Sequence, residues 1–192
     1  MVTTSWQTDV DKLHKLLSEV SFRDIKGKEL GADTGFSHWQ NLTTELRNNS
    51  NTIYLVGNGA SASMACHLAT DLAKNACIYT RVFSDASLLT AVSNDICYEK
   101  VFSEPLRWMG QKGDMLIAIS SSGRSLNVLN AAEVARNLNF SIVTLSAMKA
   151  DNPLRALGDL NLYVAAETYG DAETCHAALL HRWMDSVEIS AA

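Results

Sequence analysis

The chain has 192 residues, of which 47% are hydrophobic and 19% are charged, enough for one domain with a full hydrophobic core. Lys and Arg number 16 against 21 Asp and Glu, a formal net charge of −5, so the basic excess typical of nucleic-acid binding is absent. No run of 18 apolar residues occurs, and the first ten residues lack a signal-peptide pattern. We therefore expect a cytoplasmic protein that acts on neither membranes nor nucleic acid directly.

Two amphipathic helices are predicted before the first strand. Apolar side chains recur at helical spacing within residues 5–22 and again from Phe36 to Leu46, on either side of a glycine-containing break. The apolar faces of these helices need a partner. They pack either on the same domain or against the equivalent helices of another subunit.

From residue 52 onward, short apolar runs alternate with helical segments. The runs have the length of buried strands and cover residues 53–56, 78–83, 115–119, 140–145 and 160–164. The helical segments cover residues 61–75, 99–111, 125–137, 152–157 and 172–189. This alternation predicts a parallel α/β sheet with helices on both faces. We expect a single domain over 1–192, made of a helical extension at 1–50 and an α/β core at 51–192.

Two loops that follow predicted strands have the composition of phosphate-binding sites. They are Gly57-Asn-Gly-Ala-Ser61 and Ser120-Ser-Ser-Gly-Arg-Ser125, and a helix follows each. Glycine lets the backbone approach a ligand, and a helix N-terminus offers free N–H groups to an anion. Both loops follow parallel strands, so they are expected at one edge of the sheet. The alternatives are a ligand-free turn for the first loop and a serine N-cap for the second. A dinucleotide-binding loop is disfavoured, because Ala62 stands where the GxGxxG motif has its third glycine.

His67 and Asp71 stand four residues apart on a predicted helix, so their side chains share one face. This spacing suits a metal site or an acid/base pair, and equally an ordinary contact on a helix surface. The last predicted helix adds Glu173, His176 and His181. The two histidines are five residues apart and point in different directions, so at most one of them faces a given site.

Together these segments resemble the sugar isomerase (SIS) domain family, and within it the sedoheptulose 7-phosphate isomerase (phosphoheptose isomerase) branch. The resemblance is carried by Gly57–Ser61 with His67–Asp71, by the loop Ser93-Asn-Asp95, by Gly113–Ser125 and by Cys175–His181. It implies a flavodoxin-like five-stranded parallel sheet flanked by helices. It also implies a homotetramer, with the two N-terminal helices in the oligomer bundle and active sites between subunits.

The resemblance further implies aldose–ketose isomerisation of a phosphorylated sugar through an enediol. The substrate would be sedoheptulose 7-phosphate and the product a heptose 7-phosphate for lipopolysaccharide or another surface glycan. Asp71 and His181 would act as acid and base. The substrate-binding residues would be Asn58, Gly59, Ser61, Asn94, Asp95, Ser120, Ser122 and Ser125. Zinc, which would polarise the carbonyl, would be bound by His67, Asp71, Glu173 and His181.

Four residues depart from the family pattern: Asp71 replaces a Glu, Glu173 a Gln, Thr174 a Glu, and Arg124 an Asn. Without a metal, the extra acid at Glu173 would repel a phosphorylated sugar. In a regular helix Glu173 and His181 would lie about 12 Å apart, so either Glu173 precedes the helix or subunits share the site. These departures support a second hypothesis, a non-catalytic SIS protein that binds sugar phosphate or acts in assembly, like the replication-initiator-associating factor of bacteria.

Overall fold

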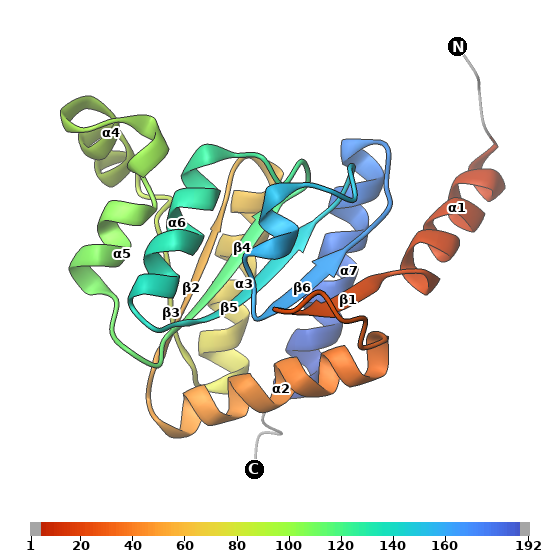
Figure 1. The fold of residues 1–192 in the computed structure, drawn as a ribbon, viewed down its shortest axis with the longest axis horizontal. Coiled ribbons are helices and arrows are strands. Elements are labelled where there is room, and N and C mark those ends of the chain that lie inside the picture. Colours follow the sequence, from red (N-terminus) through yellow and green to blue (C-terminus); the bar gives the residue numbers. More distant parts are fainter. Residues whose placement is uncertain (1–4, 189–192) are drawn as a thin grey trace.

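One sheet of six strands forms the centre of the computed structural model, which describes residues 5–188. The strands are β1 (Ser21–Asp24), β2 (Thr52–Gly57), β3 (Tyr79–Val82), β4 (Met115–Ser120), β5 (Ser141–Ser146) and β6 (Leu160–Tyr163). Their order is β1-β6-β5-β4-β2-β3 (Figure 1). Strands β2 to β6 are parallel and follow the flavodoxin order, as the sequence predicted.

The prediction of five strands, all parallel, is wrong at one edge of the sheet. Residues 21 and 22, expected at the end of the first helix, belong instead to β1, which pairs antiparallel with β6. Phe22 is fully buried and its ring contacts that of Phe36, with ring centroids 4.9 Å apart. The extension at 1–50 is therefore not wholly helical, because this short strand covers the free edge of β6 and contributes to the core.

Helices cover both faces of the sheet (Figure 1). One face packs against α1 (Trp6–Ser18), α2 (Ala32–Asn48), α3 (Ala60–Ala76) and α7 (Tyr169–Val187). The other packs against α4 (Ala86–Asp95), α5 (Ser103–Met109), α6 (Leu126–Asn137) and the 3-10 turn η2 (Pro153–Ala156), with η1 (Tyr98–Lys100) beside α6. Ile53 and Leu55 of β2 belong to the first core, and Tyr54 and Val56 to the second. Burial on both faces explains why the central strands β2 and β4 are apolar runs, whereas the edge strand β3 is only partly buried.

Four helical segments differ from prediction. The segment 99–111 is divided between η1 and α5, and 152–157 contains only the 3-10 turn η2. Helix α4 was not predicted; the Asp85 carboxylate caps it by accepting the N–H groups of Ser87 and Leu88, at 2.9 and 3.1 Å. Its last residues are Asn94 and Asp95, which we expected in a loop. The last helix begins at Tyr169, earlier than predicted, and the predicted end at residue 189 lies outside the described residues.

Helix α1 extends from the body of the protein (Figure 1). It has no buried residue, and Trp6 at its start is 79% exposed. Lys12 joins it to α7 through an ion pair with Asp171, whose Nζ–Oδ2 distance is 2.5 Å. No helix within residues 5–188 is long and apolar enough to cross a lipid bilayer.

His176 makes the stability of the fold depend on pH. It is fully buried on α7, with Nε2 3.2 Å from the carbonyl oxygen of Ser146 and no hydrogen-bond partner for Nδ1. Desolvation lowers its pKa to about 4, although the bond with Ser146 opposes this shift. Because the folded pKa lies below the unfolded value, the stabilisation is complete above about pH 6.5 and is lost as the pH falls towards 4.

We therefore expect the free energy of unfolding to fall by about 3 kcal/mol between pH 7 and pH 4 on account of His176. Urea denaturation at several pH values measures this slope. The substitution His176→Gln removes the titrating group and should flatten this part of the profile, whereas His38→Gln on α2 should not. Identical profiles for wild type and His176→Gln would contradict the assignment.

Candidate active site

A pocket of about 190 Å³ lies at the carboxyl ends of β2 and β4. These two strands are neighbours although β3 follows β2 in sequence, so the pocket occupies the switch point at which open α/β sheets bind ligands. It is lined by Asn58, Ser61, Ile119, Ser120, Ser121, Ser122, Ser125, Tyr169 and Glu173. Both predicted loops thus meet in one site. Of the eight predicted substrate-binding residues, Gly59, Asn94 and Asp95 are not in this lining.

The first loop brings backbone close to the pocket. A Cβ on Gly57 would lie 2.6 Å from the Cβ of Ser61 and 3.1 Å from the carbonyl oxygen of Ile119, so only glycine fits there. Gly59 has a φ of +56° and directly precedes α3, a conformation that favours glycine. Ser61 is consequently held in the first turn of α3, at the N-terminal end of that helix.

Asn58 is oriented by two partners that sequence reasoning did not identify. Its side-chain amide exchanges two hydrogen bonds with that of Asn127, both of 2.9 Å. The Tyr98 hydroxyl donates a third, of 3.0 Å, to Asn58 Oδ1. These partners stand 69 and 40 residues away, so no local pattern could have revealed them.

The serine loop supplies hydroxyl groups in front of α6. Ser120 Oγ and Ser125 Oγ are 3.2 Å apart, and Ser122 Oγ accepts the N–H of Arg124 at 3.3 Å. Arg124 is exposed, outside the pocket lining, and its guanidinium lies 3.8 Å from the Asp151 carboxylate. The pocket therefore offers neutral donors at the start of two helices, an arrangement suited to a phosphate group. Glu173 is its one acidic side chain.

A second group of chemically active side chains lies on the neighbouring surfaces of α3 and α7. His67 Nε2 is 3.3 Å from Asp71 Oδ2, and the rings of His67 and His181 have centroids 5.4 Å apart. One potential ligand atom from each of these three residues lies within 4.8 Å of the other two. Two imidazoles and one carboxylate are ligands that Zn²⁺ accepts, with a fourth position left for substrate or water. The same groups are suited to proton transfer.

Glu173 does not join this cluster. Helix α7 begins at Tyr169, so Glu173 belongs to the helix proper, and eight residues of helix separate it from His181, a rise of about 12 Å. Ser61 and Glu173 line the pocket from α3 and α7, while His67, Asp71 and His181 lie further along the same two helices. The site thus has one end suited to a phosphate group and another end with groups suited to proton transfer or to a metal ion.

Comparison with known proteins identifies the family of the chain. The SIS domain model matches residues 35–147. The chain belongs to the SIS domain family. Among its relatives in this family are the phosphoheptose isomerases of Helicobacter pylori (strain HPAG1) and Aliarcobacter butzleri, each 35% identical. The matches cover 150 and 146 residues, which are 75% and 73% of this chain and 78% and 77% of the relatives.

Solved structures place the fold in the same SIS family. The phosphoheptose isomerase of Neisseria gonorrhoeae matches with a TM-score of 0.78 and 25% identity, covering 95% of this chain and 97% of its own. The phosphoheptose isomerase of Francisella tularensis matches the fold with a TM-score of 0.81 at 19% identity, covering 96% of this chain and 98% of its own. The family resemblance and the helix-flanked, flavodoxin-like sheet predicted from the sequence are both confirmed.

Proposed function

We propose that this SIS-family chain is an isomerase that interconverts sedoheptulose 7-phosphate and a heptose 7-phosphate. The observation that carries the proposal is that a phosphate-type pocket and a His/Asp cluster lie along the same pair of helices. Relatives with 35% identity carry the name phosphoheptose isomerase. Turnover of sedoheptulose 7-phosphate by the purified protein, with fructose 6-phosphate as a comparison substrate, tests the proposal; turnover of neither would count against it.

The spacing along α3 fits a seven-carbon substrate. From Ser61 in the pocket to His67, six residues of helix rise about 9 Å. In an extended seven-carbon sugar, the phosphorus lies about 8 Å from the carbonyl carbon C2. A sugar whose phosphate occupies the pocket therefore extends its C1 and C2 atoms to the region of the cluster.

Proton transfer between C1 and C2 is the chemistry that the cluster supports. A base removes a proton from C1 of the ketose and the C2 carbonyl oxygen gains a proton, which gives the enediol. The enediol is then protonated at C2 while the C1 hydroxyl loses its proton, and the C1 carbonyl of the aldose forms. Asp71 and His181 are the proposed base and acid. His67, 3.3 Å from the Asp71 carboxylate, holds that carboxylate in place.

We also propose that the cluster binds zinc through His67, Asp71 and His181, since the three donors fit this ion. When bound, zinc would supply polarisation of the substrate carbonyl and stabilise the negative charge of the enediolate. Because Glu173 lies outside this cluster within the chain, substrate or water would take the fourth position on the zinc ion. Zinc content measured by mass spectrometry should be about one ion per chain and should be lost in His67→Ala; unchanged zinc in that variant would contradict the assignment.

The acid in the pocket makes Glu173→Gln informative. The Glu173 carboxylate faces the space that we assign to the phosphate, and two like charges a few ångströms apart repel by about 1 kcal/mol or more even when screened. We expect Glu173→Gln to lower KM about 5- to 10-fold with little change in kcat. Glu167→Gln, an exposed acid outside the lining, is the matched control. An increase in KM for Glu173→Gln would show that the carboxylate instead helps to bind substrate.

For the assembly, we propose a homotetramer in which the N-terminal helices of different copies pack together. Trp6 and Val10 of α1 are 79% and 37% exposed, and apolar side chains at this spacing favour a helix partner. Light scattering of wild type and of the double variant Trp6→Ser, Val10→Ser tests this, because the variant should dissociate.

The expected cytoplasmic location and the supply of heptose to a surface glycan stay predictions of the family resemblance.

The non-catalytic alternative, a sugar-phosphate-binding or assembly protein, is not favoured. A protein without catalysis has no need to keep two histidines and a carboxylate within 4.8 Å of one another beside a phosphate-type pocket. The replacement of the family Glu by Asp71 shortens the side chain by about 1.5 Å and leaves the carboxylate in the cluster.

A further inference from the structure

A second pocket, of about 330 Å³, lies between the turn after β1 and the segment that follows β5. It is lined by residues 23–27 on one side and by 150–152, 155 and 156 on the other. It shares no lining residue with the pocket at the ends of β2 and β4. None of its residues belongs to the isomerase site proposed above.

Arg155 is the feature that sets this pocket apart. The residue is 9% exposed, and its guanidinium donates to the carbonyl oxygen of Ala150 at 2.9 Å and to the Ser21 hydroxyl at 2.7 Å. It also lies 4.0 Å from the ring centre of Tyr163. Its Nε has no hydrogen-bond partner, and within residues 5–188 no carboxylate forms an ion pair with it. Burial of a cation without a counter-ion is unfavourable, so an anionic ligand would be stabilised here.

The acidic residues that the structure describes near this pocket have other partners and form no ion pair with Arg155. Arg23 pairs with Glu29 at 3.1 Å. The Asp24 carboxylate accepts hydrogen bonds from the backbone N–H groups of Lys26 and Lys28. The Asp151 carboxylate is 80% exposed and lies 3.8 Å from the Arg124 guanidinium. Desolvation, followed by the nearby Arg23, lowers the pKa of Arg155, although the Glu29 carboxylate opposes this shift. Both acids of the lining thus already have other partners. Within residues 5–188 the Lys26 ammonium forms no ion pair.

We propose that this pocket binds a phosphate group, free or carried by a small metabolite, with Arg155 as the main charged ligand and Lys26 as a second. A guanidinium presents several N–H donors in one plane, which match the oxygens of a phosphate. Three of the five donors of Arg155 have no partner among the described residues. The pocket, at about 330 Å³, is also larger than the pocket of about 190 Å³ to which we assign a phosphate group, so it has room for a phosphate with a small organic group attached.

Asn152 links this pocket to the serine loop. Its Oδ1 accepts the backbone N–H of Arg155 at 3.1 Å, and a Cβ on Gly123 would lie 1.9 Å from the same oxygen. The backbone N–H of Leu154 also donates to the Gly123 carbonyl at 3.2 Å. The two anion sites are therefore neighbours, and the experiment must resolve them.

Calorimetric titration of the full chain with inorganic phosphate, and separately with glucose 6-phosphate, tests the proposal. Wild type should bind two equivalents per chain, and the double variant Ser122→Ala, Ser125→Ala should keep the second site while it weakens the first. In Arg155→Met, the second site should weaken at least about 10-fold. Tighter binding of the ester than of inorganic phosphate would identify a metabolite as the ligand, and the reverse would identify free phosphate.

Lys26→Met is the variant that keeps the test decisive if Arg155→Met does not fold. Lys26 is exposed, so its loss should leave the fold intact and weaken the second site about 3-fold. Lys28→Met, an exposed lysine outside the lining, should have no effect. Loss of all phosphate binding in the double variant Ser122→Ala, Ser125→Ala, or unchanged affinity in Lys26→Met, would overturn the proposal. Neither readout needs turnover, so a failed isomerase assay leaves this test unaffected.

Discussion

Substitution of His181 by alanine is expected to lower kcat of the isomerase reaction by at least about 100-fold while the fold is kept. His181 is exposed on α7, and its ring lies 5.4 Å from that of His67. Removal of an exposed side chain usually changes the free energy of unfolding by less than about 0.5 kcal/mol. The loss of rate would therefore report on chemistry and not on folding. Rates from a discontinuous sugar-phosphate assay, with thermal melts alongside, measure both quantities.

His14→Ala on α1 and His38→Ala on α2 are the matched controls for His181→Ala, since both histidines are exposed and lie outside the cluster. Their kcat should equal that of wild type. Asp71→Asn should resemble His181→Ala, because an amide cannot take up the proton. Asp71→Glu keeps a carboxylate and should retain turnover. Full activity in His181→Ala would refute its assignment as a catalytic residue.

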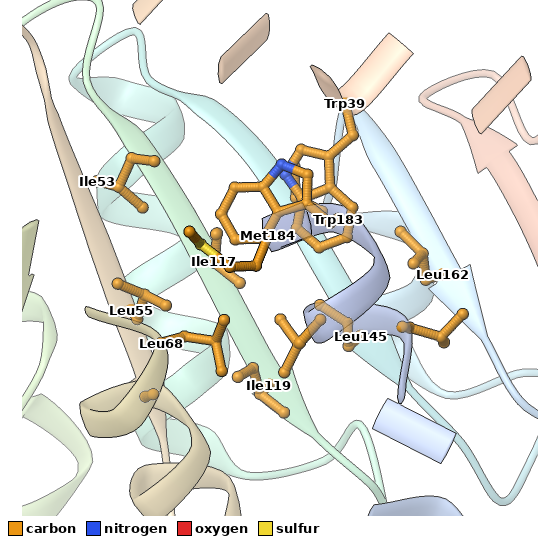
Figure 2. Close-up of a cluster of buried hydrophobic side chains, with 14 of the residues drawn as sticks. Trp39, Ile53, Leu55, Leu68, Ile117, Ile119, Leu145, Leu162, Trp183 and Met184 are labelled. Carbon is orange, nitrogen blue, oxygen red and sulfur yellow. The ribbon is translucent and has the colours of Figure 1, made fainter. Parts of the chain in front are cut away.

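Truncation of Trp183 to alanine is expected to lower the free energy of unfolding by about 3–5 kcal/mol. Trp183 and Trp39 are both fully buried and stacked, with ring centroids 4.3 Å apart and planes 8° from parallel (Figure 2). Trp183 Nε1 also donates to Thr43 Oγ1 at 3.0 Å. The truncation therefore leaves a cavity between α2 and α7 and removes a buried hydrogen bond.

Urea denaturation monitored by circular dichroism measures the effect of Trp183→Ala. Trp108→Ala is the control, because Trp108 is 58% exposed and its loss should change stability by less than about 1 kcal/mol. Equal destabilisation by the two substitutions would contradict the role of the stacked pair. If Trp183→Ala does not fold, Trp183→Phe, which keeps an aromatic ring in the core, should give a smaller but measurable loss.

The sequence predicted the parallel part of the sheet because short apolar runs mark its strands, most clearly β2 and β4, which are buried on both faces. All five of those runs became strands, β2 to β6. The four residues of β1 carry no such run, and its pairing with β6, about 140 residues away, is a tertiary effect. Helix α4 had a usable signal, since the capping residue Asp85 directly precedes a segment with apolar residues, but the sequence prediction did not include this helix.

The site was predictable to the extent that it depends on local sequence. Glycine and serine loops at strand ends indicated the pocket, and the spacing of His67 and Asp71 indicated a pair on one helix face. The approach of His181 to that pair depends on how α3 and α7 pack, and the family resemblance supplied it. The separation of Glu173 from His181 followed from helix geometry once the start of α7 was known.

Proton NMR of sedoheptulose 7-phosphate incubated with the purified, zinc-supplied protein in D₂O tests the central claim most directly. Isomerisation through an enediol exchanges solvent deuterium into the sugar, so the aldose product should appear with deuterium at C2, and His181→Ala should show neither product nor exchange. If wild type, folded and able to bind the sugar phosphate, gives no aldose and no exchange, the chain is not an isomerase of this substrate. Aldose formation without deuterium at C2 would instead contradict the proton-transfer route through Asp71 and His181.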